Sequence, residues 1–170
     1  MNFKWIGAIL IICGCALIGF SMSAAYRREE RLLRQLLVAI AHMIRELQYR
    51  VTPLPDLCMQ VSREQPGYVS KLFGNLAKEL QMQVSPDVQS CLAAAAASAG
   101  QMPQKMQEAV CILGASLGRF DLEGQLQGLE SVQVFCKDRL EEMSAGREVR
   151  LRSYQTLGLC AGAALAILLV

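Results

Sequence analysis

The chain has 170 residues, a length typical of one domain, and 53% of them are hydrophobic. Its formal net charge of +2 is too small to predict a nucleic-acid-binding protein or an enzyme for acidic substrates. Its seven cysteines are odd in number and include no C-x-x-C motif, which favours reduced thiols in a cytoplasmic compartment over a disulfide framework. The single histidine excludes the spacings of histidine-based metal sites, so we expect no metal and no cofactor.

The N-terminal segment predicts a transmembrane helix over residues 5–25, after a short extracytoplasmic N-terminus at residues 1–4. The segment carries no charged side chain and would extend roughly 31 Å as a helix, enough to cross a bilayer. Trp5 and Tyr26 bracket it, as aromatic residues do at membrane interfaces. A signal-peptidase site near Ala25 and a lipoprotein site are the alternatives. The length of the apolar run and the arginines that follow it favour an uncleaved span.

Residues 26–153 predict a cytoplasmic helical bundle, because apolar residues recur at helical spacing and no segment alternates as a strand would. The first soluble helix has an apolar seam at Leu33, Leu36, Ile40, Met43 and Leu47, widened by Leu37, Ile44 and Val51. Prolines and glycines then divide the chain into shorter helices, which we expect near residues 53–64, 67–82, 86–99 and 104–118. The segment from Cys91 to Ala99 is nearly all alanine, which predicts a helix that packs closely against a neighbour.

The last helix is expected to run from Asp121 to Val170, because this stretch contains no proline. Its aqueous part repeats apolar residues at a mean spacing of about 3.5, the period of a helix seam. These residues are Leu122, Leu126, Leu129, Val132, Cys136, Leu140 and Met143. Residues 154–170 predict a second transmembrane helix of roughly 25 Å, which just crosses a thin bilayer. Gly158 and Gly162 form a G-x-x-x-G motif suited to intramembrane helix packing, although glycine is common in all membrane helices.

Basic residues indicate the orientation of both spans. The arginines that follow the first span or precede the second are Arg27, Arg28, Arg31, Arg34, Arg147, Arg150 and Arg152. Only Lys4 lies beyond the spans, so the positive-inside rule places the bundle in the cytoplasm and both termini outside. The expected fold class is all-α. Two terminal transmembrane helices flank a cytoplasmic bundle whose long first and last helices form an antiparallel pair.

One segment matches a catalytic motif, the G-x-S-x-G of a nucleophile elbow, with Ser116 as the nucleophile. A hydrolase of that kind needs a strand before the serine and a histidine after it. The only histidine, His42, lies upstream, and we expect it to be solvated because it is off the apolar seam. Small residues near a helix end are therefore the favoured interpretation, and no catalytic residue is predicted. A membrane-anchored serine hydrolase and a membrane signalling adaptor are the alternative functions.

Two polar segments begin helices. Asp121 is expected to cap the last helix, a contribution on the order of 1 kcal/mol, and Gln125 shares its face one turn later. A paired recognition role for the two is the alternative. Thr52 is expected to cap the second soluble helix with Pro53 at its first position.

Glu46 and Tyr49 precede Thr52 on the first soluble helix and are not needed for capping. A glutamate beside an apolar seam suggests a fixed partner. That partner lies either inside the domain or on another protein.

The chain resembles the stage III sporulation protein AB family of endospore-forming bacteria. The matching segments are the first span with its arginines, E-x-x-Y-x-x-T-P-L at residues 46–54, L-G-x-x-D-x-x-x-Q at 117–125 and L-G-x-x-A-G at 157–162. Their order and spacing extend the resemblance over the whole chain. The family-defining positions, which are the candidate partner-binding residues, are Glu46, Tyr49, Thr52, Pro53, Leu54, Leu117, Gly118, Asp121 and Gln125.

The resemblance implies a component of the channel between mother cell and forespore, on the mother-cell side of the outer forespore membrane. It also implies a soluble domain similar to the cytoplasmic domains of the type II secretion platform protein F. The implied partners are a secretion-type ATPase (stage III sporulation protein AA), ring-forming membrane proteins of the same channel and the lipid bilayer, and a homo-oligomer is compatible with it. The chain contains no G-x-x-x-x-G-K-S/T motif, so we expect a non-enzymatic platform that depends on its ATPase partner.

Overall fold

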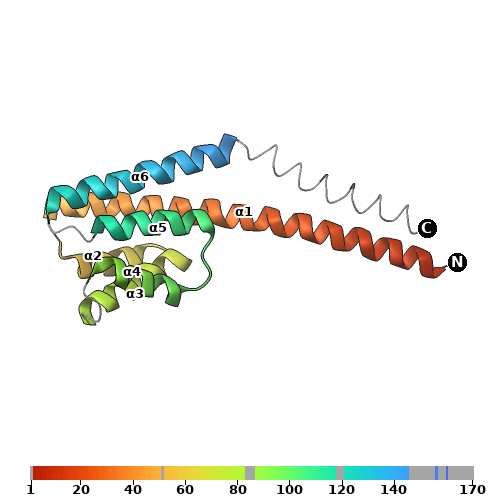
Figure 1. The fold of residues 1–170 in the computed structure, drawn as a ribbon, viewed down its shortest axis with the longest axis horizontal. Coiled ribbons are helices and arrows are strands. Elements are labelled where there is room, and N and C mark those ends of the chain that lie inside the picture. Colours follow the sequence, from red (N-terminus) through yellow and green to blue (C-terminus); the bar gives the residue numbers. More distant parts are fainter. Residues whose placement is uncertain are drawn as a thin grey trace. The chain divides into compact units, whose positions relative to one another are not determined.

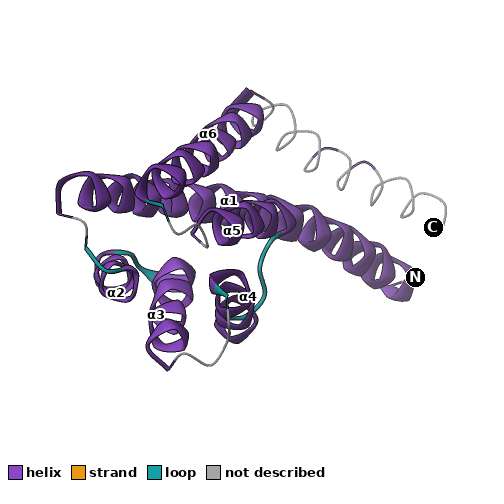
Figure 2. Cartoon of the chain, turned by 60° about the vertical axis from the view of Figure 1, so that its left-hand side comes forward, coloured by secondary structure: helices purple, strands orange, loops and turns teal. Residues whose placement is uncertain are grey.

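The protein is helical in every secondary-structure element that its computed structural model describes (Figure 1, Figure 2). The description covers residues 2–50, 52–82, 87–117 and 121–145 with Thr156 and Cys160, and for residues 2–20 the backbone alone. Over these residues the helices are α1 (Asn2–Arg50), α2 (Leu54–Glu64), α3 (Gly67–Met82), α4 (Val88–Ala99), α5 (Gln104–Leu117) and α6 (Leu122–Ala145). The predicted all-α class is confirmed.

The two predicted membrane spans are described only in part. Residues 5–25 fall within α1. Residues 154–170, apart from Thr156 and Cys160, lie outside the described residues, and so do Gly158 and Gly162. Over the described part of the chain, no helix has both the length and the apolar character required to cross a membrane.

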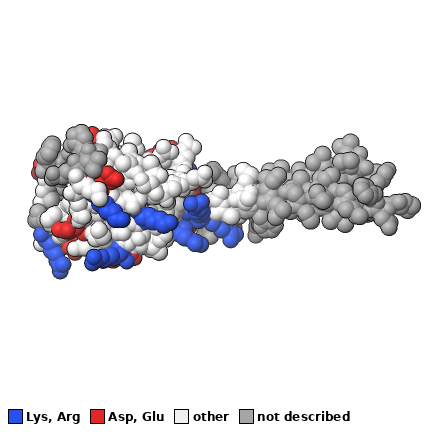
Figure 3. All heavy atoms as spheres, turned by 90° about the horizontal axis from the view of Figure 1, so that it is seen from below, with Lys and Arg blue, Asp and Glu red and all other residues white. Residues whose placement is uncertain are grey.

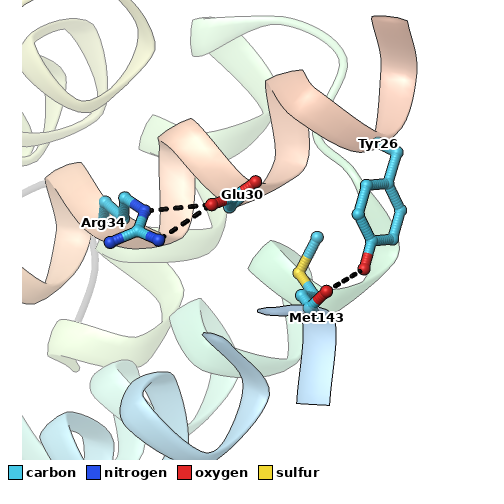
Figure 4. Close-up of polar contacts among 4 residues, drawn as sticks. All are labelled: Tyr26, Glu30, Arg34 and Met143. Carbon is cyan, nitrogen blue, oxygen red and sulfur yellow. Dashed lines mark hydrogen bonds and ion pairs between the residues drawn. The ribbon is translucent and has the colours of Figure 1, made fainter. Parts of the chain in front are cut away.

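The chain divides into two compact units, residues 1–28 with 142–170, and residues 29–141. In the first unit, the Tyr26 hydroxyl donates a hydrogen bond of 2.7 Å to the carbonyl oxygen of Met143, which joins α1 to α6 (Figure 4). In the second unit, α1 and α6 lie side by side and run in opposite directions (Figure 1). The predicted antiparallel pairing is confirmed for these segments.

The apolar seams of α1 and α6 form the core of the second unit. On α1, the predicted seam residues Leu33, Leu36, Ile40 and Met43 are fully buried, and Leu47 is nearly so. On α6, Leu129, Val132 and Cys136 are fully buried. The prediction was wrong for Leu122, which is 40% exposed. It is the first residue of α6, and no preceding turn of the helix covers it.

The shorter helices pack in chain order, α2 on α3, α3 on α4 and α4 on α5. Their bounds agree with the predicted ranges to within two residues. The α2–α3 contact is close because Ser62 and Ser70 exchange hydrogen bonds. The Ser62 hydroxyl donates to the Ser70 carbonyl at 2.8 Å, and the Ser70 hydroxyl donates to the Ser62 carbonyl at 2.6 Å. Gly74 fits there because a β-carbon would lie 2.8 Å from the Ser62 hydroxyl oxygen.

The alanine-rich helix α4 packs against both of its neighbours, α3 and α5. Ala95 is fully buried, and the Tyr68 hydroxyl of α3 donates a hydrogen bond of 3.4 Å to the Ala96 carbonyl. On the α5 side, a β-carbon at Gly114 would lie 3.3 Å from the Leu92 side chain. Beside this contact, α4 and α5 enclose a groove of about 460 Å³ that no charged residue lines among those described. The predicted close packing is confirmed for the buried side of α4.

Among the contacts that attach α5 to the long helices, two lie near its opposite ends. The Glu29 carboxylate of α1 accepts a hydrogen bond of 3.2 Å from the Lys105 backbone N–H, in the first turn of α5. An anion at this position satisfies an N–H that has no partner within its own helix. Toward the other end, Gly128 of α6 lies against Ser116 of α5, so that a β-carbon there would be 2.5 Å from the Ser116 β-carbon.

The α5–α6 contact generates a stability prediction. An alanine at position 128 would gain about 1 kcal/mol of helix propensity over glycine. The clash opposes this gain, and it involves the Ser116 β-carbon and the backbone α-carbon at 3.1 Å, which cannot move aside as a flexible side chain would. Overpacking of this kind costs about 1–3 kcal/mol. We therefore expect Gly128→Ala to lower the free energy of unfolding in urea titrations.

Gln127→Ala is the matched control for that experiment, because Gln127 is exposed on the same turn of α6. It removes no packing contact and should leave stability unchanged or slightly raised. Equal stability of the Gly128→Ala variant and the parent would contradict the close α5–α6 approach.

The described cysteines are free, in agreement with the predicted reduced thiols. Burial raises the pKa of the Cys58 thiol to about 12 and that of the Cys136 thiol to about 11. The cause is desolvation, which disfavours the thiolate form. Cys111 is exposed.

Thiol reactivity should follow this division. At pH 8 the thiolate fraction of Cys58 falls roughly a thousandfold relative to an unperturbed thiol, since each pKa unit is a factor of ten. We expect iodoacetamide to modify Cys111 within minutes and to modify Cys58 and Cys136 only after denaturation, as read by peptide mass spectrometry. Rapid labelling of Cys58 in the native protein would show that its position in the core is incorrect.

Candidate protein-interaction surface

The candidate residues fall into two segments that lie at the same end of the second unit (Figure 1, Figure 2). The first segment joins the end of α1 at Arg50 to the start of α2 at Leu54, and the second joins the end of α5 at Leu117 to the start of α6 at Leu122. The antiparallel course of α1 and α6 produces this juxtaposition, because the last turn of one helix lies beside the first turn of the other. Sequence motifs that are about seventy residues apart therefore share one end of the bundle.

The first segment is held by Glu46. Its carboxylate accepts a hydrogen bond of 3.4 Å from the Thr52 hydroxyl and lies 3.9 Å from the Arg50 guanidinium. The side chain is only 19% exposed. The fixed partner expected for this glutamate therefore includes residues of its own segment.

The predicted capping by Thr52 was wrong. Pro53 occupies the N-cap position of α2, no side chain caps the helix there, and the Pro53 carbonyl accepts a hydrogen bond of 3.0 Å from the Leu57 N–H. The Thr52 hydroxyl instead binds Glu46. A second proline, Pro55, lies in the first turn of α2, where the missing N–H would have no helical partner in any case.

Tyr49 is an aromatic residue that is 84% exposed. Glu46 and Thr52 are engaged with each other, and Leu54 is partly buried. An aromatic residue so exposed at a helix end contributes nothing to the core, and aromatic residues are enriched in protein interfaces.

The second segment is held by Asp121. Its carboxylate accepts a hydrogen bond of 2.7 Å from the Gly124 N–H, and its carbonyl accepts one of 3.1 Å from the Gln125 N–H. This confirms the predicted cap of the last helix. Gly124 gives the carboxylate room, because a β-carbon there would lie 2.7 Å from a carboxylate oxygen. Gln125 is partly buried one turn further on.

The other residues of the second segment separate into core and surface. Leu117 is 1% exposed and belongs to the core, whereas Gly118 lies outside the described residues. Leu122, which the sequence placed on the seam, is exposed beside the cap. Its position next to the N-cap residue Asp121 could have indicated this exposure, because the first turn of a helix often projects beyond the helix that it packs against. We name the exposed set Tyr49, Pro53 and Leu122 the end surface.

The role of Asp121 can be tested separately from any binding role. Asp121→Ala removes the cap and should lower the free energy of unfolding by about 1 kcal/mol. Asp121→Asn is the matched control, because its amide oxygen can accept the same hydrogen bond and should retain most of the stability. Urea unfolding followed by circular dichroism distinguishes the two, and equal losses in both variants would argue against capping.

Neither candidate for catalysis has suitable surroundings. Ser116 is 6% exposed within α5, and its hydroxyl donates a hydrogen bond of 2.8 Å to the Ile112 carbonyl, so it does not lie at the strand-to-helix turn of a nucleophile elbow. The expectation that His42 is solvated was wrong. Its side chain is 17% exposed because Glu64, the last residue of α2, covers it at 3.3 Å from Nδ1. Over the described part of the chain, no three metal-ligating side chains gather into a possible ion site.

These observations define an all-helical protein with an antiparallel pair of long helices and with both of its central sequence motifs at one end of that pair. The family described as stage III sporulation protein AB matches residues 4–170, and the chain belongs to it. Stage III sporulation protein AB of Bacillus subtilis (strain 168) is 31% identical over 77 residues. That alignment covers 45% of this chain and 45% of the relative, less than half of its length.

A solved structure of a stage III sporulation protein AB is similar to this chain with a TM-score of 0.64 at 18% identity. The superposition covers 72% of this chain and 98% of the solved one. At this identity the likeness shows a common fold. Family membership therefore assigns the protein to sporulation, and the fold agrees.

Proposed function

We propose that the protein is a non-enzymatic membrane platform of the sporulation channel between mother cell and forespore, and that its end surface docks a secretion-type ATPase, stage III sporulation protein AA. One observation carries the docking site. The two central motifs of the family resemblance meet at one end of the bundle, and exposed apolar side chains that the core does not need lie there. The channel and the ATPase follow from the resemblance to the family.

We place the membrane spans at residues 5–25 and 154–170, with residues 26–153 in the cytoplasm on the mother-cell side of the outer forespore membrane. The charge-free sequence of the first span supports this arrangement. The arginines that follow it, Arg27, Arg28, Arg31 and Arg34, are all exposed. Basic side chains also spread over the face of the protein that Figure 3 shows. Such residues favour the cytoplasmic side of a bilayer with anionic headgroups.

The position of the end surface on α1 suits a docking role. From Glu29, at the start of the second unit, to Tyr49, α1 rises roughly 30 Å along its axis. The arginines lie near the start of that rise and the end surface at its far end. A partner that binds at Tyr49 would therefore meet the platform away from the lipid. Gly158 and Gly162 would pack the membrane helices against each other or against ring-forming proteins of the channel.

Tyr49→Ala is the variant that tests docking most directly. Glu46 and Asp121 are less suitable because their carboxylates bind other groups of the chain, the Thr52 hydroxyl and the Gly124 N–H, so that their removal confuses binding with stability. Truncation of an aromatic interface residue commonly costs ten- to thirtyfold in affinity, and we expect roughly that loss for the ATPase. The double variant with Leu122→Ala should bind more weakly still. Binding is measured between the full chain in lipid nanodiscs and the purified ATPase.

Val134→Ala is the matched control, because Val134 is an apolar residue of α6 that is 54% exposed away from the end surface. Its affinity should stay within about twofold of the parent. Unchanged unfolding of the Tyr49→Ala variant would show that the fold is intact. Full affinity of the double variant would remove the end surface as the docking site.

A further inference from the structure

A groove of about 360 Å³ lies between α1 and α6 in the second unit and serves no purpose in the proposed docking. We call it the α1–α6 groove. Its lining residues are Val38, Ala41, Ile44 and Arg45 from α1, and Glu130 and Gln133 from α6. Val38 is 55% exposed, although it lies between buried seam residues on both sides in the sequence. The helix pair therefore leaves Val38 uncovered, whereas Ile44 in the same groove is only 9% exposed.

The groove carries two charges of opposite sign, Arg45 from α1 and Glu130 from α6. Elsewhere in the chain, Glu30 is paired with Arg34 at 2.8 Å (Figure 4), and Arg139 is paired with Glu108 at 3.6 Å. Arg45 and Glu130 line the same groove with opposite charges, and over the described residues neither forms an ion pair, with the other or with any third residue. The occupant that best complements the groove carries both charges and an apolar residue between them.

The groove itself has this composition, so a second copy of the chain fits it. We propose that the α1–α6 groove pairs two copies about a two-fold axis parallel to the helices, with Arg45 of each copy opposite Glu130 of the other. Such an axis places α1 of one copy beside α6 of the other and forms a four-helix arrangement. Arg45 and Glu130 lie at similar heights, because they line one groove, and a parallel axis preserves that height between copies.

The parallel direction depends on the proposed membrane anchoring, because two chains inserted in the same bilayer share their orientation. The groove is also small relative to the roughly 800 Å² that each partner buries in a stable soluble complex. Confinement to one membrane raises the effective concentration of the two copies and compensates for a small interface. The ion pairs then contribute alignment more than affinity, since exposed pairs are weak.

Site-directed crosslinking in membranes tests the pairing. The full chain, with its exposed thiols removed by Cys111→Ser and Cys160→Ser, is co-expressed in two tagged forms without the ATPase. One form carries Val38→Cys and the other Gln133→Cys. Oxidation should join the two tags in the parent background. A form with Lys78→Cys, on the exposed side of α3, is the position control and should not crosslink.

Charge reversal then distinguishes a specific pairing from chance collision. Arg45→Glu alone and Glu130→Arg alone each place like charges opposite each other and should lower the crosslinked fraction roughly five- to tenfold. The combined Arg45→Glu and Glu130→Arg variant restores opposite charges and should recover it to within about twofold. Lys78→Glu is the charge control and should leave crosslinking unchanged.

The results separate this inference from the proposed function. No joined tags, no effect of the single reversals or no recovery in the combined variant would each overturn the pairing, and so would crosslinking of Val38→Cys to a different protein in place of the second copy. Carbonate extraction of the same membranes reports anchoring independently. If the chain resists extraction but does not crosslink, only the proposed pairing is contradicted. If ATPase binding is absent while the crosslinks form, only the proposed docking is contradicted.

Discussion

Burial of the apolar seam of α1 is the interaction on which the rest of the second unit depends. Leu33, Leu36 and Ile40 are fully buried in this seam, and each such side chain contributes about 1.5–3 kcal/mol relative to exposure. Helix α5 attaches to both long helices, and α4, α3 and α2 follow it by successive contacts. Glu29 binds the start of α5, and Gly128 admits Ser116 near its end. Loss of the seam would leave neither contact in place.

The opposite directions of the two long helices also explain where the motifs lie. Because α1 ends and α6 begins at the same end of the bundle, residues 46–54 and 117–125 share that end although α2–α5 separate them in the sequence (Figure 1). Within those motifs, the Glu46 carboxylate binds the Thr52 hydroxyl and the Asp121 carboxylate binds the Gly124 N–H. Tyr49 and Leu122 are exposed. Each motif thus contains some residues that fix the local structure by hydrogen bonds and others whose side chains are exposed and available to a partner.

Much of this fold was predictable because helical periodicity and proline or glycine breaks are strong local signals. The seam residues from Leu33 to Leu47 and the helix bounds illustrate that success. The failures concern tertiary surroundings. His42 is covered by Glu64 from α2, which periodicity within α1 cannot reveal. The Thr52 hydroxyl could accept a hydrogen bond from a backbone N–H, as an N-cap does, or donate one to Glu46. The choice between them depends on tertiary structure, and the bond to Glu46 is the one formed.

The candidate site was predictable in part for the same reason. The motif residues were identifiable from the resemblance, but their separation into core, cap and surface required burial values. Leu122 shows the limit clearly, since its spacing is that of the seam and only the end of the helix pair exposes it. Which residues line the α1–α6 groove likewise followed from how two distant helices pack.

The hydrogen bonds from Thr52 to Glu46 and from Gly124 to Asp121 have a thermodynamic consequence for association. Both segments that carry exposed side chains are already ordered before a partner binds. Complex formation then sacrifices little backbone entropy, and a modest contact area can yield useful affinity. These segments lose their backbone freedom during folding, so partner binding does not require them to be ordered again.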